Sequence, residues 1–122
     1  MLSPNLILLY VRDPLASAEF YGKIFGSEPV AVSENFIAFS FDNGVTLGLW
    51  RQSKVVPQPS AIGYRGEVAF MVPGSEGVEA RYREWQSLGL PFAQELTRMD
   101  FGPTFVVLDP DGHRLRVCEP ET

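Results

Sequence analysis

This chain contains the same order of elements twice: a strand, a helix and then three strands. The first copy lies around residues 2–53 and the second around residues 64–119, with a stretch containing two prolines, residues 53–61, as an extended linker. In each copy, apolar residues at helical spacing end at a glycine, Gly26 or Gly89. The sequence therefore predicts an α+β protein of two βαβββ modules, and we expect them to form a single domain over residues 1–122.

The first module contains a hairpin whose register follows from its turn. Asp42-Asn43-Gly44 suits a three-residue loop with glycine in its last position, in which Phe41 and Val45 face each other. Counting back from that pair sets Phe36 against Trp50. The same face carries Ala38 opposite Gly48 and Ser40 opposite Thr46. The other face is more apolar, so we expect it to lie under the helix.

The strand and helix that begin each module also have local signals. Residues 5–11 are apolar at both odd and even positions, which predicts a first strand buried on both faces. Asp13 suits the cap of the first helix and Pro14 its first position, while Ser75 is a candidate cap for the second helix. Shorter strands are expected near residues 28–33 and 92–97.

The chain ends in a strong hairpin signal over residues 105–118. The turn Asp109-Pro110-Asp111-Gly112 combines a proline that fixes φ, an aspartate that can accept backbone hydrogen bonds and a glycine that tolerates positive φ. Along the second arm, the period of two places His113, Leu115 and Val117 on one face. Arg114, Arg116 and Cys118 lie on the other face, so two cations share one side of this strand.

Composition excludes several classes of protein. The net charge is −5 and there is no basic tract, so we expect no nucleic-acid partner. No apolar stretch is long enough to cross a membrane, and the first five residues do not begin a signal peptide. The single cysteine excludes an internal disulfide. We therefore expect a cytoplasmic protein without a membrane partner.

Both ends of the chain resemble one superfamily. The turn at residues 109–112, the strand at residues 5–11 and the junction at residues 12–21 are similar to those of the vicinal-oxygen-chelate superfamily. That superfamily includes glyoxalase I, the fosfomycin-resistance enzymes and the bleomycin-resistance proteins. The resemblance implies that the two modules form an open, barrel-like trough.

The metal site of that superfamily is not reproduced. Its four ligand positions fall here on Leu6, Gly48, Glu67 and Arg116. Only Glu67 can ligate a metal, and an arginine at the fourth position repels one. The only histidine, His113, is on the face opposite Arg116, and no nucleophilic triad is evident. We expect no metal, no other cofactor and no catalytic residue, although the sequence leaves open whether the protein is an enzyme.

A different set of residues faces the expected trough. Trp50 and Phe36 oppose each other, Tyr10 is on the inward face of the first strand, and Gly48 is expected to leave space beside them. Aromatic planes beside a gap suit a flat ring. Arg116 would either meet a carboxylate on such a ring or form an internal ion pair with Glu67. The alternative for the aromatic residues is a role in the core or in a dimer interface.

A closer resemblance favours the binding interpretation. The run Asp109–Cys118, together with Pro4-Asn5-Leu6, Tyr10-Val11, Glu28-Pro29-Val30, Ala38-Phe39 and Trp50, is similar to the phenazine antibiotic resistance proteins of the same superfamily. This resemblance implies a metal-free homodimer that confers resistance by sequestering a planar aromatic antibiotic. It implies stacking by Phe36 and Trp50, and a wall from the loop at residues 98–102, with Met99 and Phe101.

Two other functions remain open at this point. One is a metal-dependent glyoxalase-like lyase or thiol transferase that uses unrecognised ligands. The other is a structural or partner-binding module whose trough is filled by its own side chains.

Overall fold

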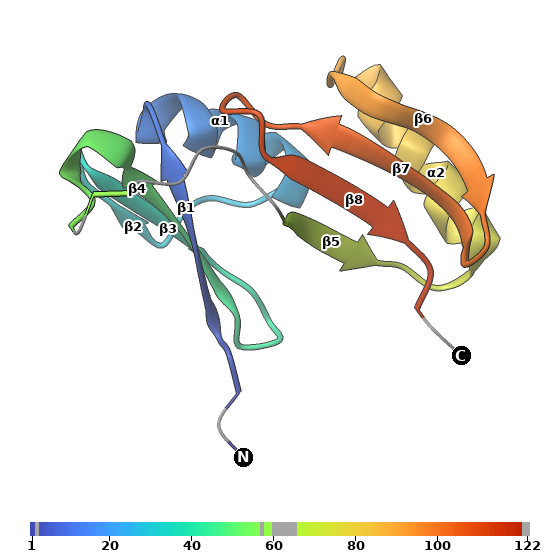
Figure 1. The fold of residues 1–122 in the computed structure, drawn as a ribbon, viewed down its shortest axis with the longest axis horizontal. Coiled ribbons are helices and arrows are strands. Elements are labelled where there is room, and N and C mark those ends of the chain that lie inside the picture. Colours follow the sequence, from blue (N-terminus) through green and yellow to red (C-terminus); the bar gives the residue numbers. More distant parts are fainter. Residues whose placement is uncertain (2, 57, 60–65, 121–122) are drawn as a thin grey trace. The chain divides into compact units, whose positions relative to one another are not determined.

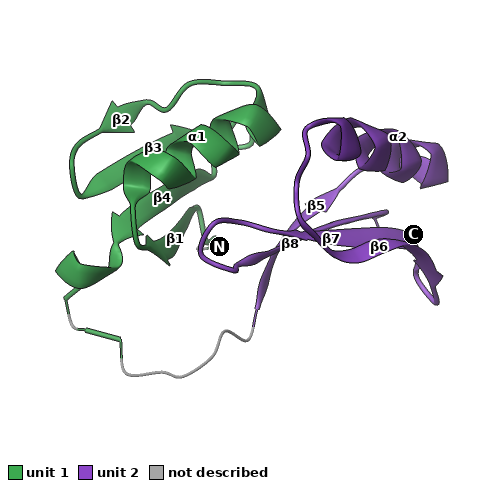
Figure 2. Cartoon of the chain, turned by 90° about the horizontal axis from the view of Figure 1, so that it is seen from above, with its two compact units in different colours: residues 1–62 green, residues 63–122 purple. Residues whose placement is uncertain are grey.

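The computed structural model describes residues 1, 3–56, 58–59 and 66–120. The chain divides into two compact units, residues 1–62 (unit 1) and 63–122 (unit 2), which Figure 2 shows in different colours. Part of the predicted linker, residues 57 and 60–61, lies outside the described residues, as do residues 64–65 of the predicted second module. Neither α1 nor α2, the two α-helices of the described chain, has the length and apolar character of a membrane span.

Unit 1 follows the predicted order of strand, helix and three strands (Figure 1). Its elements are β1 (Leu6–Val11), α1 (Pro14–Phe25), β2 (Ala31–Val32), β3 (Phe36–Ser40), β4 (Thr46–Arg51) and the 3₁₀ turn η1 (Gln52–Lys54). The strands form an open four-stranded sheet in the order β1-β4-β3-β2, with β1 parallel to β4. β2 is shorter than predicted, because only Ala31 and Val32 pair with β3. The start of the predicted extended linker is instead η1.

The predicted hairpin register of unit 1 is confirmed. Phe36 pairs with Trp50, and the following pairs are Ala38 with Gly48 and Ser40 with Thr46. The amide of Phe41 donates to the carbonyl of Val45 at 2.9 Å, and Gly44 has the positive φ, 89°, that the loop requires. Helix α1 covers one face of this sheet (Figure 2), over the buried side chains of Leu9, Val11, Ile37, Phe39, Leu47 and Leu49.

The start and end of α1 are also as predicted. The Asp13 side chain accepts from the amide of Leu15 at 3.2 Å, Pro14 begins the helix, and Gly26 ends it in the left-handed conformation. The first strand, however, is not buried on both faces. Leu6, Leu8 and Tyr10 point away from α1 and are 51%, 40% and 40% exposed, so the sheet of unit 1 presents an open apolar face.

Unit 2 repeats the same order. Its elements are β5 (Glu67–Met71), α2 (Gly74–Ser87), β6 (Phe92–Met99), β7 (Gly102–Leu108) and β8 (Arg114–Cys118). The sheet has the order β5-β8-β7-β6, with β5 parallel to β8, and it is open like the sheet of unit 1. Trp85 and Val78 of α2 are buried against the sheet, and the Trp85 ring contacts Phe70 and Phe105 edge-on.

Two predicted details of unit 2 are wrong. Helix α2 begins at Gly74, one residue before the predicted cap, and the Ser75 hydroxyl instead donates to the Glu119 carboxylate at 2.5 Å. Arg98 and Met99 belong to β6 and Gly102 begins β7, so the predicted loop at residues 98–102 is a tight turn at Asp100 and Phe101. Ladder pairing of Arg98 with Pro103 and of Met99 with Gly102 extends the two strands into the expected loop.

Candidate functional site

The face of the unit 1 sheet opposite α1 is a continuous uncharged surface, which we call the open face of unit 1. Its residues come from β1, β3 and β4 and follow from the confirmed register. They are Leu6, Leu8, Tyr10, Phe36, Ala38, Ser40, Thr46, Gly48 and Trp50. Exposed apolar surface of this kind, with hydroxyl groups at one end, is typical of a binding surface.

Three aromatic side chains occupy neighbouring positions on this face. Trp50 is the central one, because it pairs with Tyr10 of β1 on one side and with Phe36 of β3 on the other. The Tyr10 and Trp50 rings meet edge to face, with centroids 6.2 Å apart and planes at 80°. The structure thus brings the three predicted aromatic residues together.

The space expected at Gly48 is already filled by its neighbours. A Cβ placed on Gly48 would lie 2.7 Å from Cζ of Phe36 and 2.8 Å from Cδ2 of Leu8. The side chains of Phe36 and Leu8 therefore fold over the glycine and close the gap that the sequence predicts. A larger residue at this position would require Phe36 and Leu8 to move, because both side chains approach the glycine backbone closely.

Arg51, which follows Trp50, fixes the end of β4 to two other segments. Its Nε donates to Oδ1 of Asn35 at 3.1 Å, and its Nη1 and Nη2 donate to the carbonyls of Arg12 and Glu34 at 3.0 and 3.1 Å. The backbone amide of Arg51 also donates to the carbonyl of Asn35 at 2.9 Å. Asn35 immediately precedes Phe36, so these bonds hold the segments that carry Phe36 and Trp50.

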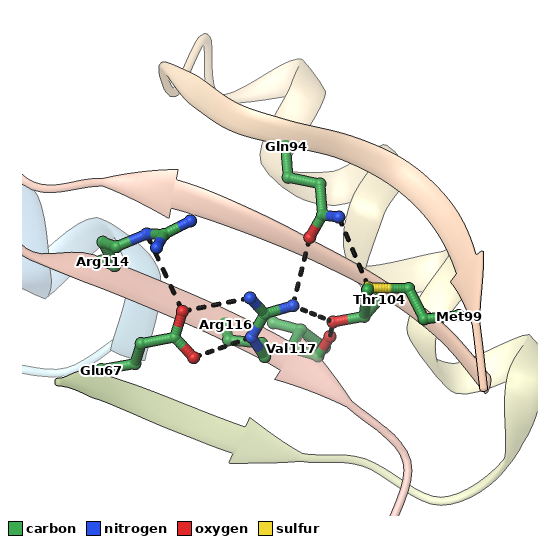
Figure 3. A network of polar contacts seen from close by, with 7 residues as sticks. All are labelled: Glu67, Gln94, Met99, Thr104, Arg114, Arg116 and Val117. Carbon is green, nitrogen blue, oxygen red and sulfur yellow. Dashed lines mark hydrogen bonds and ion pairs between the residues drawn. The ribbon is translucent and has the colours of Figure 1, made fainter. Parts of the chain in front are cut away.

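The corresponding face of unit 2 is polar, and an ion pair lies at its centre (Figure 3). Nε and Nη2 of Arg116 donate to the two carboxylate oxygens of Glu67 at 2.8 and 3.1 Å. Nη1 donates to Oε1 of Gln94 and to Oγ1 of Thr104, both at 3.1 Å. Of the alternatives that the sequence left open for Arg116, the structure shows the ion pair with Glu67.

The pair shifts both ionisation equilibria towards the charged forms. Hydrogen bonding and charge attraction from Arg116 lower the pKa of Glu67, against a smaller opposite effect of burial, and Glu67 in turn raises the pKa of Arg116. A second arginine, Arg114, lies with Nε 3.8 Å from Oε2 of Glu67, and its side chain is 48% exposed. Glu67 is thus shared by two cations.

Gln94 and Thr104 are members of this cluster that the sequence did not identify. Gln94 belongs to β6 and Thr104 to β7, the strand that lies between β6 and β8. Val106 of β7 pairs with Gln94 on one side and with Arg116 of β8 on the other. The register of β6 shifts on both sides of Gln94, so counting along the sequence could not have placed it. The sequence offered one indirect signal. Arg116 lies on the polar face of a central strand, where an arginine needs hydrogen-bond acceptors such as Gln94 and Thr104.

The two predicted wall residues lie at the end of the β6–β7 hairpin. Met99 is 43% exposed, and its sulfur is 3.6 Å from Nε2 of Gln94. Phe101 is 49% exposed in the turn. Met99 therefore borders the polar cluster.

The four superfamily ligand positions do not make a metal site. Leu6 and Gly48 offer no donor, and Arg116 occupies the carboxylate of Glu67. Within residues 1, 3–56, 58–59 and 66–120, no group of three or more His, Cys, Asp or Glu side chains is close enough to hold a metal ion. His113 lies on the helix side of β8, where its Nδ1 is 2.6 Å from Oδ2 of Asp109, within the terminal hairpin. The residues present do not fit a divalent ion.

Comparison with known proteins identifies the family. Residues 3–117 match the Glyoxalase/Bleomycin resistance protein/Dioxygenase superfamily. The chain belongs to this superfamily. The resemblance that the sequence suggested, and the duplicated α+β fold expected from it, are thereby confirmed.

Individual proteins are similar to this chain over nearly its whole length. The phenazine antibiotic resistance protein EhpR of Enterobacter agglomerans is 35% identical over 121 residues, which cover 96% of this chain and 92% of the relative. A protein of Agrobacterium tumefaciens solved in solution by NMR is 39% identical, with complete coverage of both chains and a TM-score of 0.86. A lactoylglutathione lyase of Agrobacterium tumefaciens is 22% identical, covers 96% of this chain and 92% of its own, has a TM-score of 0.78 and shows the shared fold alone.

Proposed function

We propose that this protein confers antibiotic resistance by binding and sequestering planar aromatic compounds such as phenazines, without a metal or another cofactor. The observation that carries the proposal is the open face of unit 1, where Tyr10, Phe36 and Trp50 are adjacent on an uncharged surface. The similarity to a phenazine antibiotic resistance protein supports it.

The physical basis of capture is ring stacking on an apolar surface. Burial of a planar ligand against Trp50 and Phe36 removes apolar area from water, and offset stacking adds about 0.5–1.5 kcal/mol for each aromatic pair. Tyr10 contacts the Trp50 ring edge-on, and this contact favours one orientation of the indole before the ligand binds. Preorganisation of this kind reduces the entropy lost on binding.

Unit 2 contributes polar and flexible groups to recognition. Arg116 is fixed by Glu67 and forms a rigid polar surface instead of a free cation for a ligand carboxylate. Met99, which borders the polar cluster, and Phe101, in the β6–β7 turn, are half-exposed apolar side chains, and methionine adapts readily to ligands of different shape. We include Arg116, Glu67, Met99 and Phe101 in the proposed ligand-binding set with Trp50, Phe36 and Tyr10.

The proposal includes an assembly and a location. We propose that residues 1–122 work as one domain in a cytoplasmic homodimer. Sedimentation velocity should then give a species of twice 13.6 kDa, and a monomer at micromolar concentration would contradict the homodimer.

Calorimetric titration with phenazine-1-carboxylate tests the binding function. We expect saturable binding to the wild type that is unchanged by EDTA or by added Zn²⁺. Trp50→Ala should weaken binding about thirtyfold, equivalent to about 2 kcal/mol, because one stacking surface and its buried area are lost. Trp85→Phe is the matched control, because Trp85 is buried in the core of unit 2.

Two outcomes would contradict this proposal. Equal affinity in Trp50→Ala and the wild type would exclude stacking on Trp50. Binding that requires a divalent ion, or stoichiometric uptake of one, would instead favour the metal-dependent lyase or thiol transferase.

A further inference from the structure

Arg51 connects two aromatic residues of the open face of unit 1 through the backbone beside them. It directly follows Trp50, and its Nε donates to Oδ1 of Asn35 at 3.1 Å. Its backbone amide donates to the carbonyl of the same asparagine at 2.9 Å. Asn35 directly precedes Phe36. The Arg51–Asn35 pair therefore joins the backbone next to the Trp50 ring to the backbone next to the Phe36 ring.

The same guanidinium also reaches the segment that follows β1. Nη1 of Arg51 donates to the carbonyl of Arg12 at 3.0 Å, and Nη2 donates to the carbonyl of Glu34 at 3.1 Å. Arg12 lies two residues after Tyr10, the third aromatic residue of this face. One side chain thus bonds to residues that lie within two positions of each of the three rings.

The three rings lie near the ends of their strands, where the sheet holds them least. Phe36 is the first residue of β3, and Tyr10 and Trp50 are the next-to-last residues of β1 and β4. The pairing of β3 with β4 ends at Phe36 and Trp50. Because the ends of elements fray more readily than their middles, the relative position of these rings depends on contacts beyond the strand pairing.

A surface ion pair does not account for the arrangement of Arg51. The carboxylate of Asp13 is 4.0 Å from Nη2, and its side chain is 57% exposed, so this pair contributes little. The Arg51 side chain is only 26% exposed, and each of its three nitrogens donates to an acceptor at 3.0–3.1 Å. A planar guanidinium suits this task, because its donors point in fixed and different directions.

We propose that Arg51 is a positioning residue for ligand binding, which sets the relative position of the three aromatic rings before a planar ligand arrives. It acts through Asn35 and the carbonyls of the neighbouring segments, without contacting the ligand. A planar ligand touches several rings at once, so rings that move independently must be ordered on binding, at a cost in affinity. This inference rests on the proposed function, because it assigns the residue that prepares the same surface.

Substitutions at both ends of the Arg51–Asn35 bond separate positioning from charge. Arg51→Lys keeps the positive charge and Asn35→Leu leaves the net charge unchanged, but each removes this side-chain hydrogen bond. We expect each to weaken binding of phenazine-1-carboxylate about three- to tenfold, the cost of ordering about one side chain. The conservative Asn35→Asp keeps an oxygen acceptor for Nε and should retain binding, although its added negative charge would repel the ligand. Calorimetric titration measures these affinities.

The fluorescence of Trp50 gives a second readout, which a loss of stability alone would not change. In a Trp85→Phe background, Trp50 is the only tryptophan. Its time-resolved anisotropy in the free protein should decay faster in Arg51→Lys and Asn35→Leu, because the indole moves more freely. Ile24→Val is the control, because it removes a buried methylene group from α1 and lowers stability without changing the open face. Its affinity and anisotropy should equal those of the parent.

The outcomes separate this inference from the proposed function. Parental affinity or anisotropy in both Arg51→Lys and Asn35→Leu, with the phenazine still bound, would overturn the inference and leave the proposed function standing. Weaker binding by Asn35→Asp than by Asn35→Leu would also overturn it, because charge would then decide the affinity. A wild type that does not bind phenazine-1-carboxylate would overturn both. A melting curve for each variant shows that it is folded at the titration temperature.

Discussion

The ring of Phe36 lies directly over the backbone of Gly48, so close that a Cβ on the glycine would be 2.7 Å from the ring atom Cζ. The two residues are on adjacent strands, Phe36 in β3 and Gly48 in β4, and both belong to the open face of unit 1. Gly48 does not have a positive φ, so crowding by neighbouring side chains, and not backbone conformation, favours glycine here.

Gly48→Ala should disturb this surface. The new methyl group would also lie 2.8 Å from Cδ2 of Leu8, so both Phe36 and Leu8 must move. We expect a loss of about 1–3 kcal/mol in the free energy of unfolding, as for other overpacked sites, and weaker binding of phenazine-1-carboxylate. Urea unfolding and calorimetric titration measure the two effects.

Gly22→Ala is the matched control for that variant. Its Cβ would be 3.5 Å from the carbonyl oxygen of Ser27, which is ordinary contact. In the middle of α1, alanine should stabilise the helix by about 0.5–1 kcal/mol. If Gly48→Ala and the wild type have the same free energy of unfolding, Phe36 can move away from the new methyl group without destabilising the fold.

Arg51→Met should loosen the segment that carries Phe36. The variant keeps most of the apolar stem but loses the three hydrogen bonds to Asn35, Arg12 and Glu34. We expect destabilisation of about 1–3 kcal/mol, because three acceptors lose a charged donor. Thermal or urea unfolding measures the effect.

The control for Arg51→Met is Arg81→Met. Arg81 forms one ion pair with Glu84 on the surface of α2, with 42% of its side chain exposed. Its loss should change stability by less than about 0.5 kcal/mol. A similar effect of both substitutions would mean that the Arg51 contacts contribute no more than a surface ion pair.

The sequence was sufficient where local chemistry sets the geometry. The turn at Asp42-Asn43-Gly44 sets the register of β3 and β4, and counting residues from that turn is enough to place Phe36 beside Trp50. The same holds for the start of α1 at Asp13 and Pro14 and for the two faces of β8. In each case a few consecutive residues contain the whole signal.

The sequence was insufficient where the outcome depends on side-chain packing or on an irregular strand. The gap expected at Gly48 is closed because the side chains of Phe36 and Leu8 lie over it. Gln94 was missed because two register shifts surround it, and the loop expected near Met99 is shorter because ladder pairing extends through it. The partner of Arg116 stayed undecided because Glu67 is 49 residues away along the chain.

The stability contributed by Glu67 should depend on pH. Arg116 lowers the pKa of Glu67 in the folded state below its ordinary value of 4.5, so at low pH the unfolded chain takes up this proton before the folded chain does. The contribution is therefore fully present above about pH 4.5 and is lost as the pH falls through the lowered pKa. Glu67→Gln removes the ionisable group and with it this dependence.

The measurement compares unfolding free energies of the wild type and Glu67→Gln at pH 7 and at steps below pH 4.5. We expect the variant to be less stable at pH 7, because Arg116, with 18% of its side chain exposed, loses its counterion. The difference should shrink as the pH falls. Glu19→Gln removes one charge from an exposed position of α1 and shows how much net charge alone contributes. A difference for Glu67→Gln that stays constant from pH 7 into the acid range would mean that the pair with Arg116 does not stabilise the ionised form of Glu67.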